Sequence, residues 1–201
     1  GCGVTGSWVS PVLMRASRRL TVFDPDLVDG SSPHGLWLAA QGPKVMALPF
    51  SPYEVEAVAD RYEGDYPEES DLFVLCTDSA RSRLLVATNP AAIGQVLDIR
   101  ATPTALVVWA FGMRPGNNLW IAWTRSLEGY DEPQACHHDN VPIRAGALAA
   151  AFVAWWVTSG RPNGLWSIPY GYEPTVSFDA QQTNPRFDDP EWADSDTVMV
   201  R

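Results

Sequence analysis

The sequence predicts an α+β fold in which antiparallel β-hairpins form one or two sheets and about four helices pack on one face. Three observations predict this class. Short apolar runs alternate with turns that contain Gly, Pro or Asn, several segments begin with helix-capping residues, and one long apolar segment fits a helix. Of the 201 residues, 46% are hydrophobic and 19% are charged, so the chain can bury a sizeable core. We expect a single globular domain over residues 1–201.

Helix start signals are the first support for this class. Ser10 followed by Pro11 is a cap and first-turn pair, and Ser51-Pro52 with Glu54 forms a capping box. Asn89-Pro90 opens a third helix, and the 13-residue apolar stretch Ala145–Val157 is too short to span a bilayer and indicates a buried core helix. The predicted helices cover residues 10–20, 51–63, 90–97 and 143–158.

Three β-hairpins are the second support. Each combines two short apolar runs with a polar or Gly/Pro-containing connection, which is typical of antiparallel strands. The predicted strand pairs are 35–40 with 44–48, 72–77 with 84–88, and 105–111 with 119–124.

A possible internal repeat leaves two alternatives open. The segment 36–39 (Leu-Trp-Leu-Ala) recurs at 119–122 as Leu-Trp-Ile-Ala. Four-residue matches arise easily by chance, but a duplication would give two similar halves, at about 1–100 and 101–160. Prolines recur from Gly160 onward, so residues 161–201 are predicted to form an irregular or short-stranded, Pro-rich tail.

The charge balance limits the classes of partner. The chain has 24 acidic and 14 basic residues, a net charge of −10, which repels phosphate backbones and anionic lipid surfaces. We therefore expect no nucleic acid and no membrane partner, and predict binding to another protein, a basic one. The oligomeric state is left open.

Cysteine usage and the N-terminal residues point to a reducing compartment. Three cysteines do not make a disulfide scaffold, and no export signal is found, so we expect a cytoplasmic protein. The start Gly1–Thr5 fits an acylation pattern weakly, and an ordinary processed glycine is the favoured alternative. We assign no segment to a phosphate-binding glycine loop and expect no cofactor.

The segment from Glu128 to Asn140 holds the one reactive cluster that the sequence suggests. Cys136, His137, His138 and Asp139 follow one another, and neighbouring side chains point apart in an extended chain. A metal would need a third ligand from elsewhere, and none of the recurrent metal-binding spacings occurs, so we expect no metal. A hydrolase using the Cys136–Asp139 loop is kept as an alternative.

Aromatic residues beside carboxylates suggest a docking surface. Such amphipathic anchors are typical of protein interfaces, although loop aromatics folded back onto the core are the competing interpretation. We predict an acidic, non-enzymatic protein-binding module, of an inhibitor or immunity type that masks a basic partner. A structural subunit of a larger assembly is a further alternative. The candidate partner-binding residues are Trp123, Tyr130, Asp131, Glu132, His137, His138, Asp139, Tyr170 and Tyr172.

Overall fold

The computed structural model describes residues 1–28, 42–47, 54–64, 70–88, 94–112, 117–128 and 141–170. Helices and strands together form an α+β fold, which confirms the predicted class. The helices are α1 (Gly6–Ala16), α2 (Ala80–Thr88), α3 (Asn118–Arg125) and α4 (Val141–Thr158), with the 3-10 helix η1 (Lys44–Ala47). The strands are β1 (Arg19–Phe23), β2 (Leu27–Val28), β3 (Gly42–Pro43), β4 (Glu54–Val58), β5 (Leu72–Leu75), β6 (Gln95–Ala101), β7 (Ala105–Gly112) and β8 (Gly164–Pro169).

The strand directions are mixed rather than antiparallel throughout. β1 and β4 pair in parallel, β2 and β3 form a small antiparallel pair, and the largest sheet has the order β5-β6-β7-β8. Within it β5 and β6 are parallel, whereas β7 is antiparallel to both β6 and β8. The two parallel pairs correct the prediction of hairpins only. Parallel pairing requires a long crossover connection, which local turn signals do not reveal.

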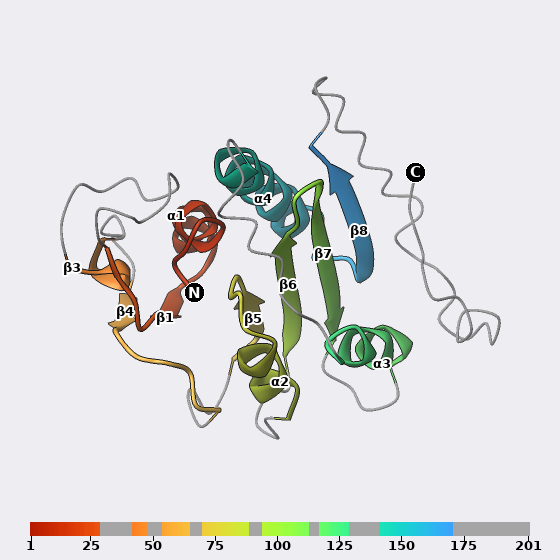
Figure 1. Cartoon of the computed structure of the whole chain (residues 1–201), viewed down its shortest axis with the longest axis horizontal. Helices are drawn as coiled ribbons and strands as arrows, with labels where there is room; N and C mark the ends of the chain where they lie inside the picture. The colour runs from red at the N-terminus through yellow and green to blue at the C-terminus, as the bar shows by residue number, and fades with distance from the viewer. Residues whose placement is uncertain are drawn as a thin grey trace.

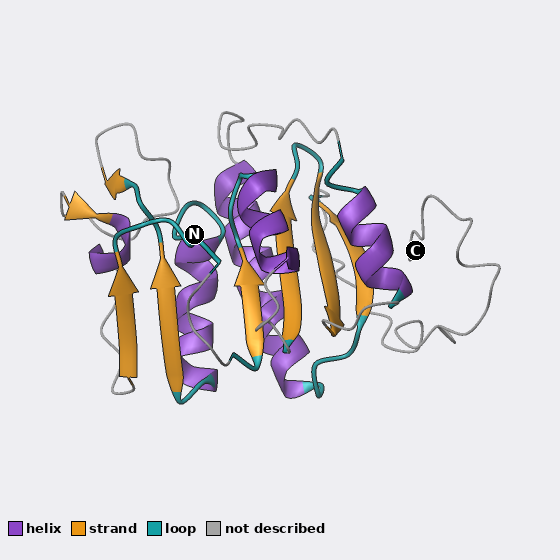
Figure 2. Cartoon of the chain, turned by 90° about the horizontal axis from the view of Figure 1, so that it is seen from below, coloured by secondary structure: helices purple, strands orange, loops and turns teal. Residues whose placement is uncertain are grey.

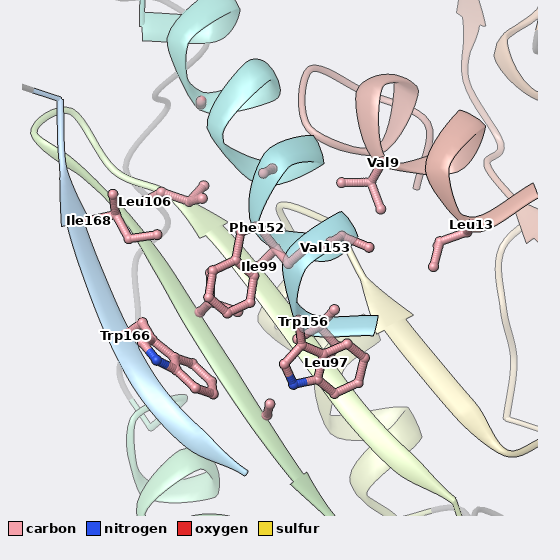
Figure 3. Packing of buried hydrophobic residues seen from close by; sticks show 14 residues of the cluster. Val9, Leu13, Leu97, Ile99, Leu106, Phe152, Val153, Trp156, Trp166 and Ile168 are labelled. Carbon is pink, nitrogen blue, oxygen red and sulfur yellow. The ribbon is translucent and has the colours of Figure 1, made fainter. Parts of the chain in front are cut away.

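Helices cover both faces of the largest sheet, which corrects the prediction that they share one face (Figure 1). Side chains alternate along each strand, so β6 sends Leu97 and Ile99 to one side and Val96 to the other. The first side packs against α4 and α1, with Phe152, Val153 and Trp156 in contact with the strands (Figure 3). The second side packs against α2 and α3.

Helices α1 and α4 approach each other closely at Gly146. A Cβ atom at this position would lie 2.3 Å from Cδ1 of Trp8, so only a glycine leaves room for the indole ring. The apolar residues Ala145–Val157 do form a helix, as predicted, but only one face is buried: Ala145, Ala149 and Phe152 have no exposed surface, whereas Ala147, Ala151 and Ala154 are exposed. No helix in the described part of the chain is long and apolar enough to cross a bilayer.

Three predicted helices need correction. α1 begins at Gly6 rather than Ser10, because the Ser10 hydroxyl donates to the Gly6 carbonyl inside the helix at 2.7 Å instead of capping it. The segment predicted as helix 51–63 contains strand β4, which pairs in parallel with β1. The segment predicted as helix 90–97 leads into β6, a strand buried along most of its length. In both cases pairing with a distant strand overrides the local cap signals.

Several predicted strands also differ. Residues 84–88 belong to α2 and residues 119–124 to α3, since short apolar runs do not distinguish a strand from a helix. The predicted turn before residue 119 contains the N-cap of α3, where the Asn117 side chain accepts a hydrogen bond from the Leu119 N–H at 2.9 Å. Residues 164–169 form β8, a short strand within the segment predicted to be irregular or short-stranded. Residues 44–47 form η1, and the partner run 35–40 lies outside the described residues.

Candidate functional site: the glycine loop before helix α1

The first six residues form a glycine loop that opens helix α1. Gly1, Gly3 and Gly6 have the spacing G-x-G-x-x-G, although we assigned no segment to a phosphate-binding glycine loop. This spacing before a helix is typical of loops that hold phosphate groups against backbone N–H groups. The N-cap residue Thr5 makes no side-chain hydrogen bond to the helix start, where the Ser7 N–H donates to the Gly3 carbonyl at 3.0 Å and the Trp8 N–H to the Thr5 carbonyl at 3.2 Å.

The three glycines have different surroundings. A Cβ at Gly6 would lie 1.8 Å from the Gly1 carbonyl oxygen, and one at Gly1 would lie 2.9 Å from the Cys76 carbonyl oxygen. Gly6 and Gly1 therefore allow close packing inside the protein. A Cβ at Gly3 would meet no atom of the described residues within 4 Å, so Gly3 faces open space in this part of the chain. A ligand can approach the backbone at Gly3.

Asp24 follows strand β1 directly and holds the glycine loop in place. Its Oδ2 accepts a hydrogen bond from the Cys2 backbone N–H at 2.5 Å, and its Oδ1 accepts one from the Asp26 N–H at 2.9 Å. Only 5% of Asp24 is exposed. An acidic residue about 20 residues after the glycines contacts a ribose in dinucleotide-binding folds, and Asp24 has this spacing at the end of β1.

The loop between β5 and α2 borders the glycine loop from the other side. Gly1 lies against the backbone of Cys76 and Thr77, which follow β5. Figure 2 shows the N-terminus near the C-terminal ends of β1, β4 and β5, where the arrowheads lie. Asp78 in this loop is exposed, and Ser79 accepts a hydrogen bond from the Ser82 N–H at 3.2 Å, which caps α2.

Lys44 brings a cation to the same region. Its Nζ lies 2.7 Å from Asp26 Oδ2, and its N–H donates to the Asp26 carbonyl at 2.9 Å. Burial alone would lower the pKa of Lys44, but the hydrogen bond to Asp26 and the nearby carboxylates of Asp24 and Asp78 outweigh it and raise the pKa. Lys44 is therefore a positively charged group among three carboxylates.

A buried ionic cluster lies beneath the β5–α2 loop. Asp98 on β6 has no exposed surface, and its carboxylate accepts from Arg83 Nε at 2.9 Å and from Arg100 Nε at 2.7 Å. The Trp123 Nε1–H donates to the same carboxylate at 2.7 Å. Arg100 also donates to Ser126 Oγ at 3.1 Å. The cluster joins α2, β6 and α3.

Both described cysteines lie at the glycine loop and are free thiols. Cys2 is in the loop, and Cys76 follows β5. Burial raises the pKa of Cys2 to about 12 and that of Cys76 to about 11, so both are protonated at neutral pH. Protonated, buried thiols are poor nucleophiles.

Two of the predicted partner-binding residues fall in the described part of the chain. Trp123 is fully buried and bonded to Asp98, which corrects its assignment to a surface, because a core indole cannot contact a partner. Tyr170 is partly buried against the core, and burial raises the pKa of its phenol. The others, Tyr130, Asp131, Glu132, His137, His138, Asp139 and Tyr172, lie outside the described residues, as does Cys136.

The described residues include no group of three or more His, Cys, Asp or Glu side chains that could hold a metal ion by themselves. The arrangement at the start of α1 instead offers backbone N–H donors, a carboxylate and a lysine. These groups can bind an anion that carries hydroxyl groups. The spacing of the glycines and of Asp24 was visible in the sequence, although Lys44 and Asp78 join them only in the fold.

Comparison with known proteins indicates a shared fold. No protein-family model matches the sequence, and no curated protein sequence matches it either. The structure is similar to E. coli MccB with ATP, at a TM-score of 0.58 and 16% identity over 88% of this chain and 64% of that one. It is also similar to MccB with AMPCPP and selenomethionine MccA, at a TM-score of 0.55, 14% identity and the same coverage. The chain thus spans 64% of the length of these MccB chains.

Proposed function

We propose that this protein binds ATP, with the glycine loop Gly1–Gly6 against the phosphates and Asp24 against the ribose. The observation that carries the proposal is the open space at Gly3 in a loop that also starts a helix. The similarity to a structure of MccB with ATP supports the same ligand.

The phosphate side rests on backbone donors and Lys44. The Ser7 and Trp8 N–H groups at the start of α1 donate to the Gly3 and Thr5 carbonyls, so an anion there would rely on the loop amides that precede Ser7 and on the helix dipole. Lys44 is a cation close to Asp24, whose carboxylate binds the glycine loop. A phosphate at Gly3 would therefore meet fixed donors rather than mobile side chains.

The ribose side rests on Asp24. A carboxylate has about four lone-pair sites, and the Cys2 and Asp26 N–H groups use two of them. A ribose hydroxyl group can reach the remaining sites only through the 5% of Asp24 that is exposed. These two bonds also fix the orientation of the carboxylate before the ligand arrives.

Magnesium is expected to strengthen binding. The carboxylates of Asp24, Asp26 and Asp78 surround Lys44, so a bare polyphosphate would be partly repelled. Mg²⁺ in nucleotide sites is usually held by one or two carboxylates together with the phosphates themselves. Exposed Asp78 is the carboxylate we assign to this contact.

Calorimetric titration of the chain with ATP in Mg²⁺ or in EDTA tests the proposal. We expect saturable binding in Mg²⁺, and about tenfold weaker binding by Gly3→Ala, because the added methyl group occupies the ligand's space. Gly112→Ala is the matched control, since a Cβ there also meets nothing within 4 Å. No heat of binding by the wild-type chain would refute the proposal.

We infer that a protein or peptide is a second ligand. The net charge of −10 and the similarity to structures of MccB with MccA support this role. The basic nature of the partner, an inhibitor or immunity function and a cytoplasmic location remain predictions from the sequence. Titration with a Lys/Arg-rich peptide at low and high salt tests whether the partner is basic. Attraction between opposite charges requires that the binding weaken as the salt concentration rises.

A further inference from the structure

Arg83 links the loop that carries Asp78 to the buried carboxylate of Asp98. Its Nε donates to Asp98 Oδ1 at 2.9 Å, and its Nη2 donates to the Thr77 carbonyl oxygen. Arg83 is 3% exposed and lies on α2. One guanidinium group therefore spans from β6 to the end of β5.

Thr77 is held by its backbone carbonyl and by its side chain. Its carbonyl accepts from Arg83, and its hydroxyl accepts from the Ser79 N–H at 3.1 Å. Asp78 lies between these two anchored positions, and Gly1 of the glycine loop contacts the Thr77 backbone. A displacement of Thr77 would therefore change both Asp78 and the glycine loop.

We propose that Arg83 is a positioning residue for the candidate nucleotide site, acting by fixing the Thr77–Ser79 loop. The inference rests on the proposed function, because it assigns the loop a role in ATP binding. The planar guanidinium group is suited to this task, since it bonds two acceptors at a fixed angle. A lysine at the same position keeps the positive charge beside Asp98, but its single ammonium group cannot reproduce the planar pair of hydrogen bonds to Asp98 and to the Thr77 carbonyl.

Arg100 provides a matched control within the same cluster. It also donates from Nε to Asp98, at 2.7 Å, and is 6% exposed. Its second hydrogen bond goes to Ser126, after α3, and not to Thr77. Arg83→Lys and Arg100→Lys therefore disturb the same carboxylate, but only the first releases the Thr77 carbonyl.

The test combines ATP titration with hydrogen exchange of the Thr77–Ser79 amides. We expect Arg83→Lys to bind ATP about tenfold more weakly than Arg100→Lys, which corresponds to ~1.4 kcal/mol. We also expect the loop amides to exchange faster in Arg83→Lys only. Thermal unfolding and circular dichroism of both variants verify that they are folded and similarly destabilised.

The outcomes separate this inference from the proposed function. Equal ATP affinity and equal loop exchange in the two folded variants would overturn the positioning role, even though the wild-type chain binds ATP. Failure of the wild-type chain to bind ATP would overturn the proposed function and, with it, the link to ATP. If Arg83→Lys does not fold, Arg83→Gln, which retains donors without the charge, takes its place in the same comparison.

Discussion

The Cys2 backbone N–H donates to Asp24 Oδ2 at 2.5 Å, which joins two residues 22 positions apart. The bond ties the glycine loop to the end of β1. Because Asp24 also accepts from the Asp26 N–H, one carboxylate orders the loops on both sides of it. The consequences of this contact and of its neighbours can be tested by substitution.

Asp24→Asn is expected to lower both stability and ATP affinity. One carboxylate oxygen becomes an NH₂ group that faces a backbone N–H, so a buried hydrogen bond is lost, at a cost of about 1–3 kcal/mol. Urea unfolding and calorimetric titration measure the two effects. Asp26→Asn is the control, because 62% of the Asp26 side chain is exposed and such ion pairs contribute ~0–1 kcal/mol. Equal losses in both variants would contradict the prediction.

Gly6→Ala is expected to destabilise the protein by about 1–3 kcal/mol, as overpacked sites do. The new Cβ would lie 1.8 Å from the Gly1 carbonyl oxygen, so the loop must move. Gly3→Ala is the control and should alter stability by less than about 0.5 kcal/mol, because nothing lies near its Cβ. Chemical unfolding distinguishes the two, and similar midpoints for both variants would argue against the loop geometry.

Asp98→Ala is expected to be among the most destabilising single substitutions, at about 3–5 kcal/mol. It leaves the Arg83 and Arg100 guanidinium groups buried without their shared carboxylate and removes the acceptor of the Trp123 indole. Denaturant unfolding followed by tryptophan fluorescence provides the measurement. A loss below about 1 kcal/mol would show that the cluster contributes little to the fold.

Stability is expected to fall as the pH rises above about 9, where unfolded cysteines ionise. Burial raises the pKa of Cys2 to about 12 and of Cys76 to about 11, so in this range the unfolded chain binds fewer protons than the folded one. The slope of unfolding free energy against pH is then negative. Urea titrations of the wild type and of Cys76→Ala, at a series of pH values rising from pH 8, test this. The same slope in Cys76→Ala would exclude Cys76 as a source.

Local sequence predicted some elements well and others poorly. The apolar run Ala145–Val157 was sufficient for α4, because its length is incompatible with a strand. The capping box of Ser51 and Glu54 favoured a helix over residues 51–63, and only the pairing with β1 decided for a strand at Glu54–Val58. Leu119–Thr124 was equally ambiguous, and the Asn117 cap decided for α3.

The candidate site was partly legible in the sequence. The glycine spacing and Asp24 were present in the sequence. They were not recognised as a site, because Gly1–Thr5 was interpreted as an ordinary processed N-terminus. Lys44 and Asp78 could not have been predicted as neighbours, since they belong to segments far apart along the chain. Trp123 was assigned to a surface because its amphipathic ring is typical of interfaces, yet its indole bonds to Asp98 in the core.

Composition and periodicity by themselves determined that this chain folds, that it combines helices with strands, and that its longest apolar segment forms a helix. They do so because burial of apolar surface and backbone preferences act over short stretches of chain. Only the tertiary structure decided that strands pair in parallel, that Asp24 holds the loop before α1, and that the Asp98 carboxylate accepts hydrogen bonds from two arginines. Those contacts join residues distant in sequence, and their free energy depends on which groups the fold removes from water together.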